Sequence, residues 1–159
     1  MNKEPFVIAA HEILNDSFVE VLRCIEGLSL AGLNWRPSGG QTNSLAVLAM
    51  HSLRSTLNWL EIAFGQPLTD RDLEFLVSAD DSAPFQERAQ SLVGSIQAVL
   101  ASDIAFDGAS LRPTGALPDS GDAPEVAAAW ALLHTVDHLR EHVGQMLLTH
   151  QLWSLQTST

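Results

Sequence analysis

Basic residues and cysteine are both scarce in this sequence of 159 residues. Lys3 is the only lysine, and 8 lysines and arginines together face 19 aspartates and glutamates, which gives a formal net charge of −11. Nucleic-acid phosphates and anionic lipid headgroups repel a chain this acidic, so we expect neither as a partner. Cys24 is the only cysteine, which excludes an intrachain disulfide. Its apolar neighbours favour a buried, unreactive thiol.

Long uncharged apolar runs are missing as well. No window of about 18 residues is both free of charge and strongly apolar, so the sequence predicts no transmembrane helix. The first five residues do not have the charged start and unbroken apolar run of a signal peptide. We therefore expect a cytoplasmic protein without a membrane partner.

Helical periodicity is the main pattern that the sequence does contain. Apolar residues recur every three or four positions in segments 5–28, 43–65, 85–100 and 124–153, and each segment predicts a helix with one buried face. Convincing strand-period runs and internal repeats are absent from the sequence. The length suits one domain of ordinary size. We predict a single all-α domain over residues 1–159, built as a four-helix bundle.

The connection between the third and fourth predicted helices, residues 103–124, is long and contains three prolines and three glycines. It allows a β-hairpin, although nothing in it alternates cleanly between apolar and polar residues. Pro124 suits the first turn of a helix, so we place the start of the fourth helix there.

Histidines form the most informative pattern. Three of the six, His134, His138 and His142, follow one another at intervals of four residues and therefore share one stripe of the fourth helix. The charged residues Asp137 and Glu141 lie on another side of this helix. We expect His138 and His142 to face the bundle interior, where a bare imidazole costs about 1–3 kcal/mol.

The second predicted helix carries a further histidine, His51, on a mixed polar face with Ser55 and Asn58. If this helix packs against the fourth, His51 meets His138 and His142, and three imidazoles hold one metal ion with an open position for water or substrate. Neutral imidazoles favour zinc, nickel or another late divalent ion. The alternative is that these histidines are hydrogen-bonded core residues with no ligand.

Two segments resemble a known family. The terminal-helix segment 134–145, HTVDHLREHVGQ, and the segment 43–51, NSLAVLAMH, are similar to the signatures of the DinB-like superfamily of metal-binding four-helix bundles. The resemblance implies an up-down-down-up bundle and a homodimer, with His51, His138 and His142 as metal ligands. It places His134 beside the site or in its outer shell. The chain departs from the commoner pattern at Val143, where arginine often precedes Gly-Gln.

Two classes of function stay open. The first is a metal-dependent transferase or hydrolase that acts on a small molecule, because some members of the family that the chain resembles use a low-molecular-weight thiol. In that case Ser55 and Asn58 orient a substrate, and Gln145 either hydrogen-bonds at the site or serves local packing. The sequence assigns no catalytic acid or base. The second class is a non-catalytic bundle that binds a metal or a small ligand.

Overall fold

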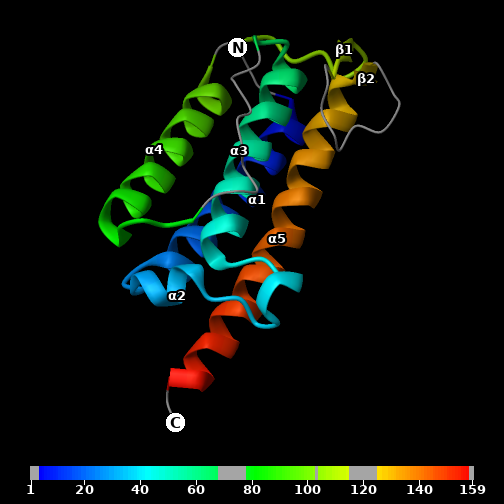
Figure 1. Cartoon of the computed structure of the whole chain (residues 1–159). Helices are drawn as coiled ribbons and strands as arrows, with labels where there is room; N and C mark the ends of the chain where they lie inside the picture. The colour runs from blue at the N-terminus through cyan, green and yellow to red at the C-terminus, as the bar shows by residue number, and fades with distance from the viewer. Residues whose placement is uncertain (1–3, 68–77, 103, 115–124, 158–159) are drawn as a thin grey trace.

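Helices make up most of the protein, as a computed structural model shows (Figure 1). The structure describes residues 4–67, 78–102, 104–114 and 125–157. The all-α prediction is confirmed. The helices are α1 (Pro5–Ile25), α2 (Leu30–Asn34), α3 (Leu45–Phe64), α4 (Ser82–Ala101) and α5 (Ala128–Thr157), with a 3₁₀ turn at Gly39–Gln41.

Contacts between helix ends fix the directions of the four long helices. The rings of Phe6, at the start of α1, and Phe64, at the end of α3, both pack on the ring of Phe106. At the opposite end, the Gln86 amide near the start of α4 donates to the carbonyl of Ile25, which ends α1. Figure 1 shows α5 starting beside the end of α3. Helices α1 and α5 therefore run in one direction, and α3 and α4 run in the other.

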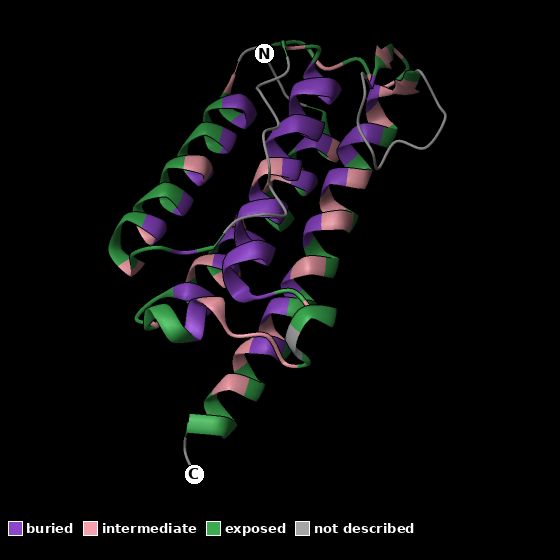
Figure 2. Ribbon diagram, in the orientation of Figure 1, coloured by how far each residue is buried: buried purple, intermediate pink, exposed green. Residues whose placement is uncertain are grey.

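Helix α3 is the central element of the bundle. It packs against α1, α4 and, most extensively, α5, and every residue of it except Arg54 is buried (Figure 2). Ser44 caps its first turn by accepting a hydrogen bond from the Val47 amide. Gly65 ends it with a φ of 65°, a conformation that glycine adopts without strain. These two signals fix where α3 begins and ends.

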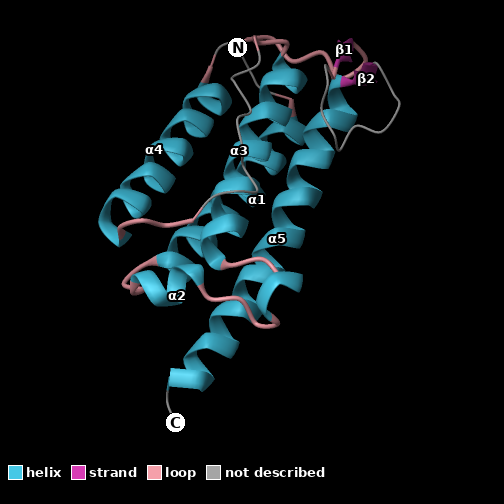
Figure 3. Ribbon diagram, viewed as in Figure 1, coloured by secondary structure: helices cyan, strands magenta, loops and turns pink. Residues whose placement is uncertain are grey.

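The connection before α5 differs from the prediction. Strands β1 (Leu111–Pro113) and β2 (Glu125–Ala127) pair antiparallel beside the start of α5 (Figure 3). Pro124 lies outside the described residues, but the strand that follows it shows that the expected helix start was wrong, since α5 begins at Ala128.

Helix α2 is a second departure, because the sequence predicted no helix between residues 28 and 43. Ser29 caps this short helix through the Gly32 amide. A Cβ at Gly32 would lie 2.8 Å from Nε1 of Trp153, so only glycine lets the helix approach α5 this closely. Trp153 also packs on Trp35, with ring centroids 5.8 Å apart. The segment before α3 is thereby anchored to the last turns of α5.

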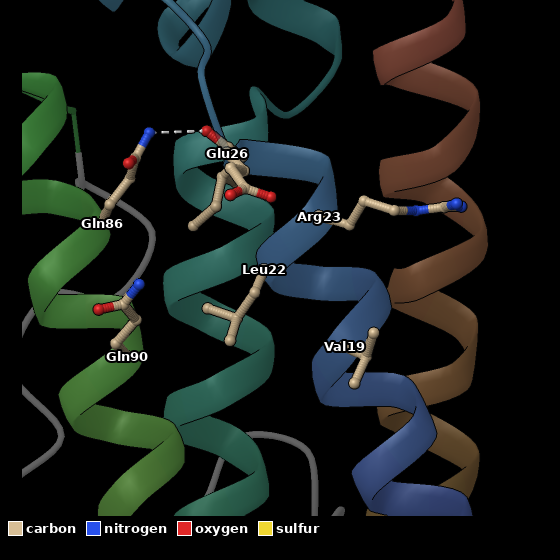
Figure 4. A pocket seen from close by; sticks show the side chains of 7 residues that line it. Val19, Leu22, Arg23, Glu26, Gln86 and Gln90 are labelled. Atoms are coloured by element: carbon tan, nitrogen blue, oxygen red, sulfur yellow. Dashed lines mark hydrogen bonds between the residues drawn. The ribbon is translucent and has the colours of Figure 1, made fainter.

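The packing between α1 and α4 leaves a surface pocket of about 420 Å³. Leu22, Glu26 and Gln90 are among the residues that line it (Figure 4). No histidine belongs to the described part of its lining. Cys24 is buried nearby in α1, and burial raises the pKa of its thiol, in agreement with the expected unreactive state. Among the described helices, none has the length and hydropathy needed to span a membrane.

Candidate metal centre

Three imidazole rings converge between α3 and α5. The ring centroid of His51 lies 5.1 Å from that of His138 and 4.8 Å from that of His142, and the last two are 4.5 Å apart. One ring nitrogen of each residue lies within 4.8 Å of the others. We call these three residues the histidine cluster. The structure therefore brings together the three residues that the spacing and the resemblance nominated as ligands.

The local sequence explains this convergence. His138 and His142 are one helical turn apart, so both project from the same side of α5. Helix α3 runs antiparallel to α5 and presents His51 opposite them, in its second turn. His51 is only 4% exposed, whereas the two histidines of α5 are half-buried. The cluster therefore has one deeply buried member and two that reach toward the surface.

The spacing of the nitrogens fits a metal ion. The Nε2 atoms of His138 and His142 are 3.2 Å apart. Two imidazole nitrogens bound to a tetrahedral zinc ion at 2.0–2.1 Å are separated by about 3.3–3.4 Å. The same 3.2 Å also suits an imidazole–imidazole hydrogen bond. A hydrogen bond would join only these two rings, whereas one metal ion would bind a nitrogen of all three.

Gln145 and Glu141 orient His142. Nε2 of Gln145 lies 3.3 Å from a carboxylate oxygen of Glu141, and Oε1 of Gln145 lies 3.1 Å from Nδ1 of His142. Because an ionised carboxylate only accepts hydrogen bonds, the Gln145 amide nitrogen faces Glu141 and its carbonyl oxygen faces the imidazole. Nδ1 of His142 is then the donor, and the unprotonated Nε2 faces Nε2 of His138.

His134 lies beside the histidine cluster but is not part of it. Its ring stacks on Trp130 at 4.8 Å with an interplanar angle of 9°, and it meets the edge of Trp59 at 4.6 Å. The centroid of His138 is 5.6 Å away. His134 therefore joins an aromatic wall next to the cluster, which agrees with the expected position beside the site.

Comparison with known proteins identifies the family. A model of the DinB superfamily matches residues 14–146, which include the whole histidine cluster and Gln145. The chain belongs to the DinB superfamily. A solved structure described as that of a conserved protein from Enterococcus faecalis has the same fold, with a TM-score of 0.71 and 14% identity. The alignment covers 96% of this chain and 98% of that one. Among curated proteins, no match was found.

Two further residues nominated from the sequence lie inside this DinB-superfamily bundle. Ser55 and Asn58 follow His51 by one and two turns of α3, and both are buried. The Ser55 hydroxyl makes no hydrogen bond to any residue in the described parts of the chain. The substrate-orienting role expected for these two residues stays a prediction.

The role of Glu141 was not predicted from the sequence. Glu141 was expected on the charged side of the helix with Asp137, and it is exposed. Its carboxylate nevertheless fixes the orientation of the Gln145 amide. The spacing contained the signal, because Glu141 and Gln145 are four residues apart and His142 and Gln145 are three apart.

Proposed function

We propose that this DinB-superfamily protein binds a divalent transition-metal ion, zinc or nickel, through His51, His138 and His142. The observation that supports the proposal is the convergence of three ring nitrogens from two helices within 4.8 Å. Neutral imidazoles are the donors that late first-row ions prefer. Gln145 supports the site by holding His142 in the tautomer whose Nε2 is unprotonated and can coordinate a metal ion.

We further propose that the protein is a metal-dependent transferase or hydrolase of a small molecule. Three protein ligands leave a coordination position open, and a metal ion bound in this way lowers the pKa of water or of a thiol enough to supply a nucleophile near neutral pH. The three histidines hold the ion, and the wall of Trp59, Trp130 and His134 limits the space beside it. A thiol cosubstrate, homodimer formation and a cytoplasmic location stay predictions.

The second candidate is a bundle that holds a metal or a small ligand without catalysis. One observation favours it: among the described residues, no carboxylate or cysteine joins the histidine cluster. A general acid or base is therefore not assigned, and a catalytic role depends on the metal-bound nucleophile alone.

Metal analysis of untagged protein tests the binding proposal. Wild type, His138→Ala and His150→Ala are each dialysed against zinc, passed through a desalting column and analysed for metal. His150 is a matched control because it lies on α5 outside the cluster. We expect stoichiometric zinc in wild type and in His150→Ala, with little in His138→Ala. Equal zinc in all three proteins, or none in wild type, would refute the assignment.

A kinetic assay separates the two candidates. The zinc-loaded and nickel-loaded proteins are incubated with low-molecular-weight thiols and an electrophile, and in parallel with ester substrates in the absence of thiol. A rate that requires both the metal and His138 supports an enzyme. If the protein is fully loaded and no metal-dependent rate is found with any thiol or ester, the non-catalytic candidate is favoured.

A further inference from the structure

A groove of about 320 Å³ lies at the end of the bundle where α3 begins. It is bounded by the loop before α3, by the first turn of α3, and by the C-terminal half of α5, which extends past the other helices in Figure 1. Its volume is at the lower end of the range for small-molecule sites, about 300–1,000 Å³. Its apolar walls are formed by Pro37, Leu48, Leu148 and Leu152.

The remaining lining residues are polar but uncharged: Thr42, Asn43, Gln145 and Thr149. Among the residues that the structure describes, no lysine, arginine, aspartate or glutamate lines this groove, although the chain carries a formal net charge of −11. A charged ligand would find no counter-charge there, and burying an unpaired charge is costly. The lining therefore selects a neutral, mainly apolar ligand that makes a few hydrogen bonds.

The groove is next to the histidine cluster. Gln145 lines it and also accepts the hydrogen bond from Nδ1 of His142. On the α3 side, Leu48 is 2% exposed and precedes His51 by less than one turn. The Nδ1 edge of His142 faces Gln145, whereas its Nε2 faces His138. A molecule in the groove is thus separated from the cluster by one imidazole ring, which suits the unreactive part of a substrate.

We propose that this groove binds the neutral, apolar part of the small-molecule substrate. The groove's role in substrate binding rests on the function proposed above, but binding of an apolar molecule to the groove does not depend on metal. Two observations favour a small molecule over a protein surface as the occupant. The groove is small, and Gln145, which lines it, also hydrogen-bonds to His142, a candidate metal ligand.

Binding of N-phenyl-1-naphthylamine tests the groove. This neutral probe fluoresces strongly only in apolar surroundings. It is titrated into metal-free wild type, Leu148→Glu and Leu133→Glu. Leu148 and Leu133 are matched, because both are exposed leucines of α5, at 58% and 54%, and only Leu148 lines the groove. We expect saturable binding to wild type and Leu133→Glu, and binding at least about tenfold weaker to Leu148→Glu.

Each other result contradicts the inference. Equal binding to all three proteins places the probe elsewhere. If wild type fails to bind the probe while light scattering shows a dimer that Leu148→Glu converts to a monomer, a second copy of the chain covers the groove. Absence of binding without such a dimer also overturns it. The metal-binding proposal is tested independently of the groove, because a protein that takes up no zinc can still bind the probe.

Discussion

Replacing Gln145 by leucine tests whether the Glu141–Gln145–His142 chain supports metal binding. The substitution keeps the size of the side chain but removes the acceptor that lies 3.1 Å from Nδ1 of His142. Without this acceptor, the imidazole tautomer that carries its proton on Nε2 becomes more populated. In that tautomer Nε2 cannot coordinate the metal ion. Loss of such an outer hydrogen bond costs about 10–100-fold in metal affinity.

The structure places the expected loss at the lower end of this range. Gln145 is exposed and His142 is only half-buried, so water can replace the lost acceptor at Nδ1. We therefore expect zinc to bind about tenfold more weakly to Gln145→Leu, which corresponds to about 1.4 kcal/mol. Because Gln145 is exposed, the free energy of unfolding of the metal-free protein should change by less than about 0.5 kcal/mol.

Zinc affinity is measured by competition with a fluorescent chelator. The zinc affinity of Gln145→Glu should stay close to that of wild type, because a carboxylate also accepts a hydrogen bond from Nδ1. Gln151→Leu is the matched control, since Gln151 is an exposed glutamine on the same helix that does not line the groove. Wild-type affinity in Gln145→Leu, with binding abolished in His138→Ala, would refute the tautomer argument while leaving the metal site intact.

Three further predictions concern stability and reactivity. Zinc at about 100 times its dissociation constant should add about 2.7 kcal/mol to the free energy of unfolding and raise the Tm by about 5–10 °C, and calorimetry should show no such rise in His51→Ala. In urea unfolding, Gly32→Ala should lose about 1–3 kcal/mol because its Cβ would meet Trp153 at 2.8 Å. The control Gly94→Ala, in the middle of α4 with nothing within 4 Å of the new Cβ, should instead gain about 0.5–1 kcal/mol. The Cys24 thiol, whose pKa is raised by burial, should react with Ellman's reagent only when the protein unfolds; rapid reaction of the native protein at neutral pH would show that the thiol is accessible.

The long helices were predictable because their signals are local. Helix α3 was expected at 43–65 and runs over Leu45–Phe64, with Ser44 as the cap. The start of α5 was missed because β2 depends on pairing with β1, in which Val126 lies opposite Arg112. Such a pairing joins residues far apart in the sequence, and three-residue strands are too short to show an alternating pattern. Helix α2 is likewise too short for helical periodicity.

The candidate site was predictable to the extent that helix geometry determines it. The four-residue spacing of His138 and His142 fixed their common face, but only the packing of α3 on α5 brings His51 to them. The contact of Trp59 with Trp130 and His134 also depends on this packing. Sequence alone left two roles open for Gln145, because both are compatible with its spacing from His142. The position of its amide between Glu141 and His142 in the structure selects one of them.

Charge distribution connects the proposed metal centre to the proposed groove. A divalent ion would change the formal charge of the chain only from −11 to about −9. Close to the histidine cluster, however, the field of the ion would dominate the electrostatic potential. Three neutral imidazoles leave its charge uncompensated, while exposed charges beyond about 10 Å are largely screened at ordinary ionic strength. An anionic nucleophile, hydroxide or thiolate, would be attracted to the centre. A charged group finds no partner in the uncharged groove one imidazole away. The two regions therefore suit different halves of a reaction, with the anionic partner at the histidines and the neutral electrophile's apolar part in the groove.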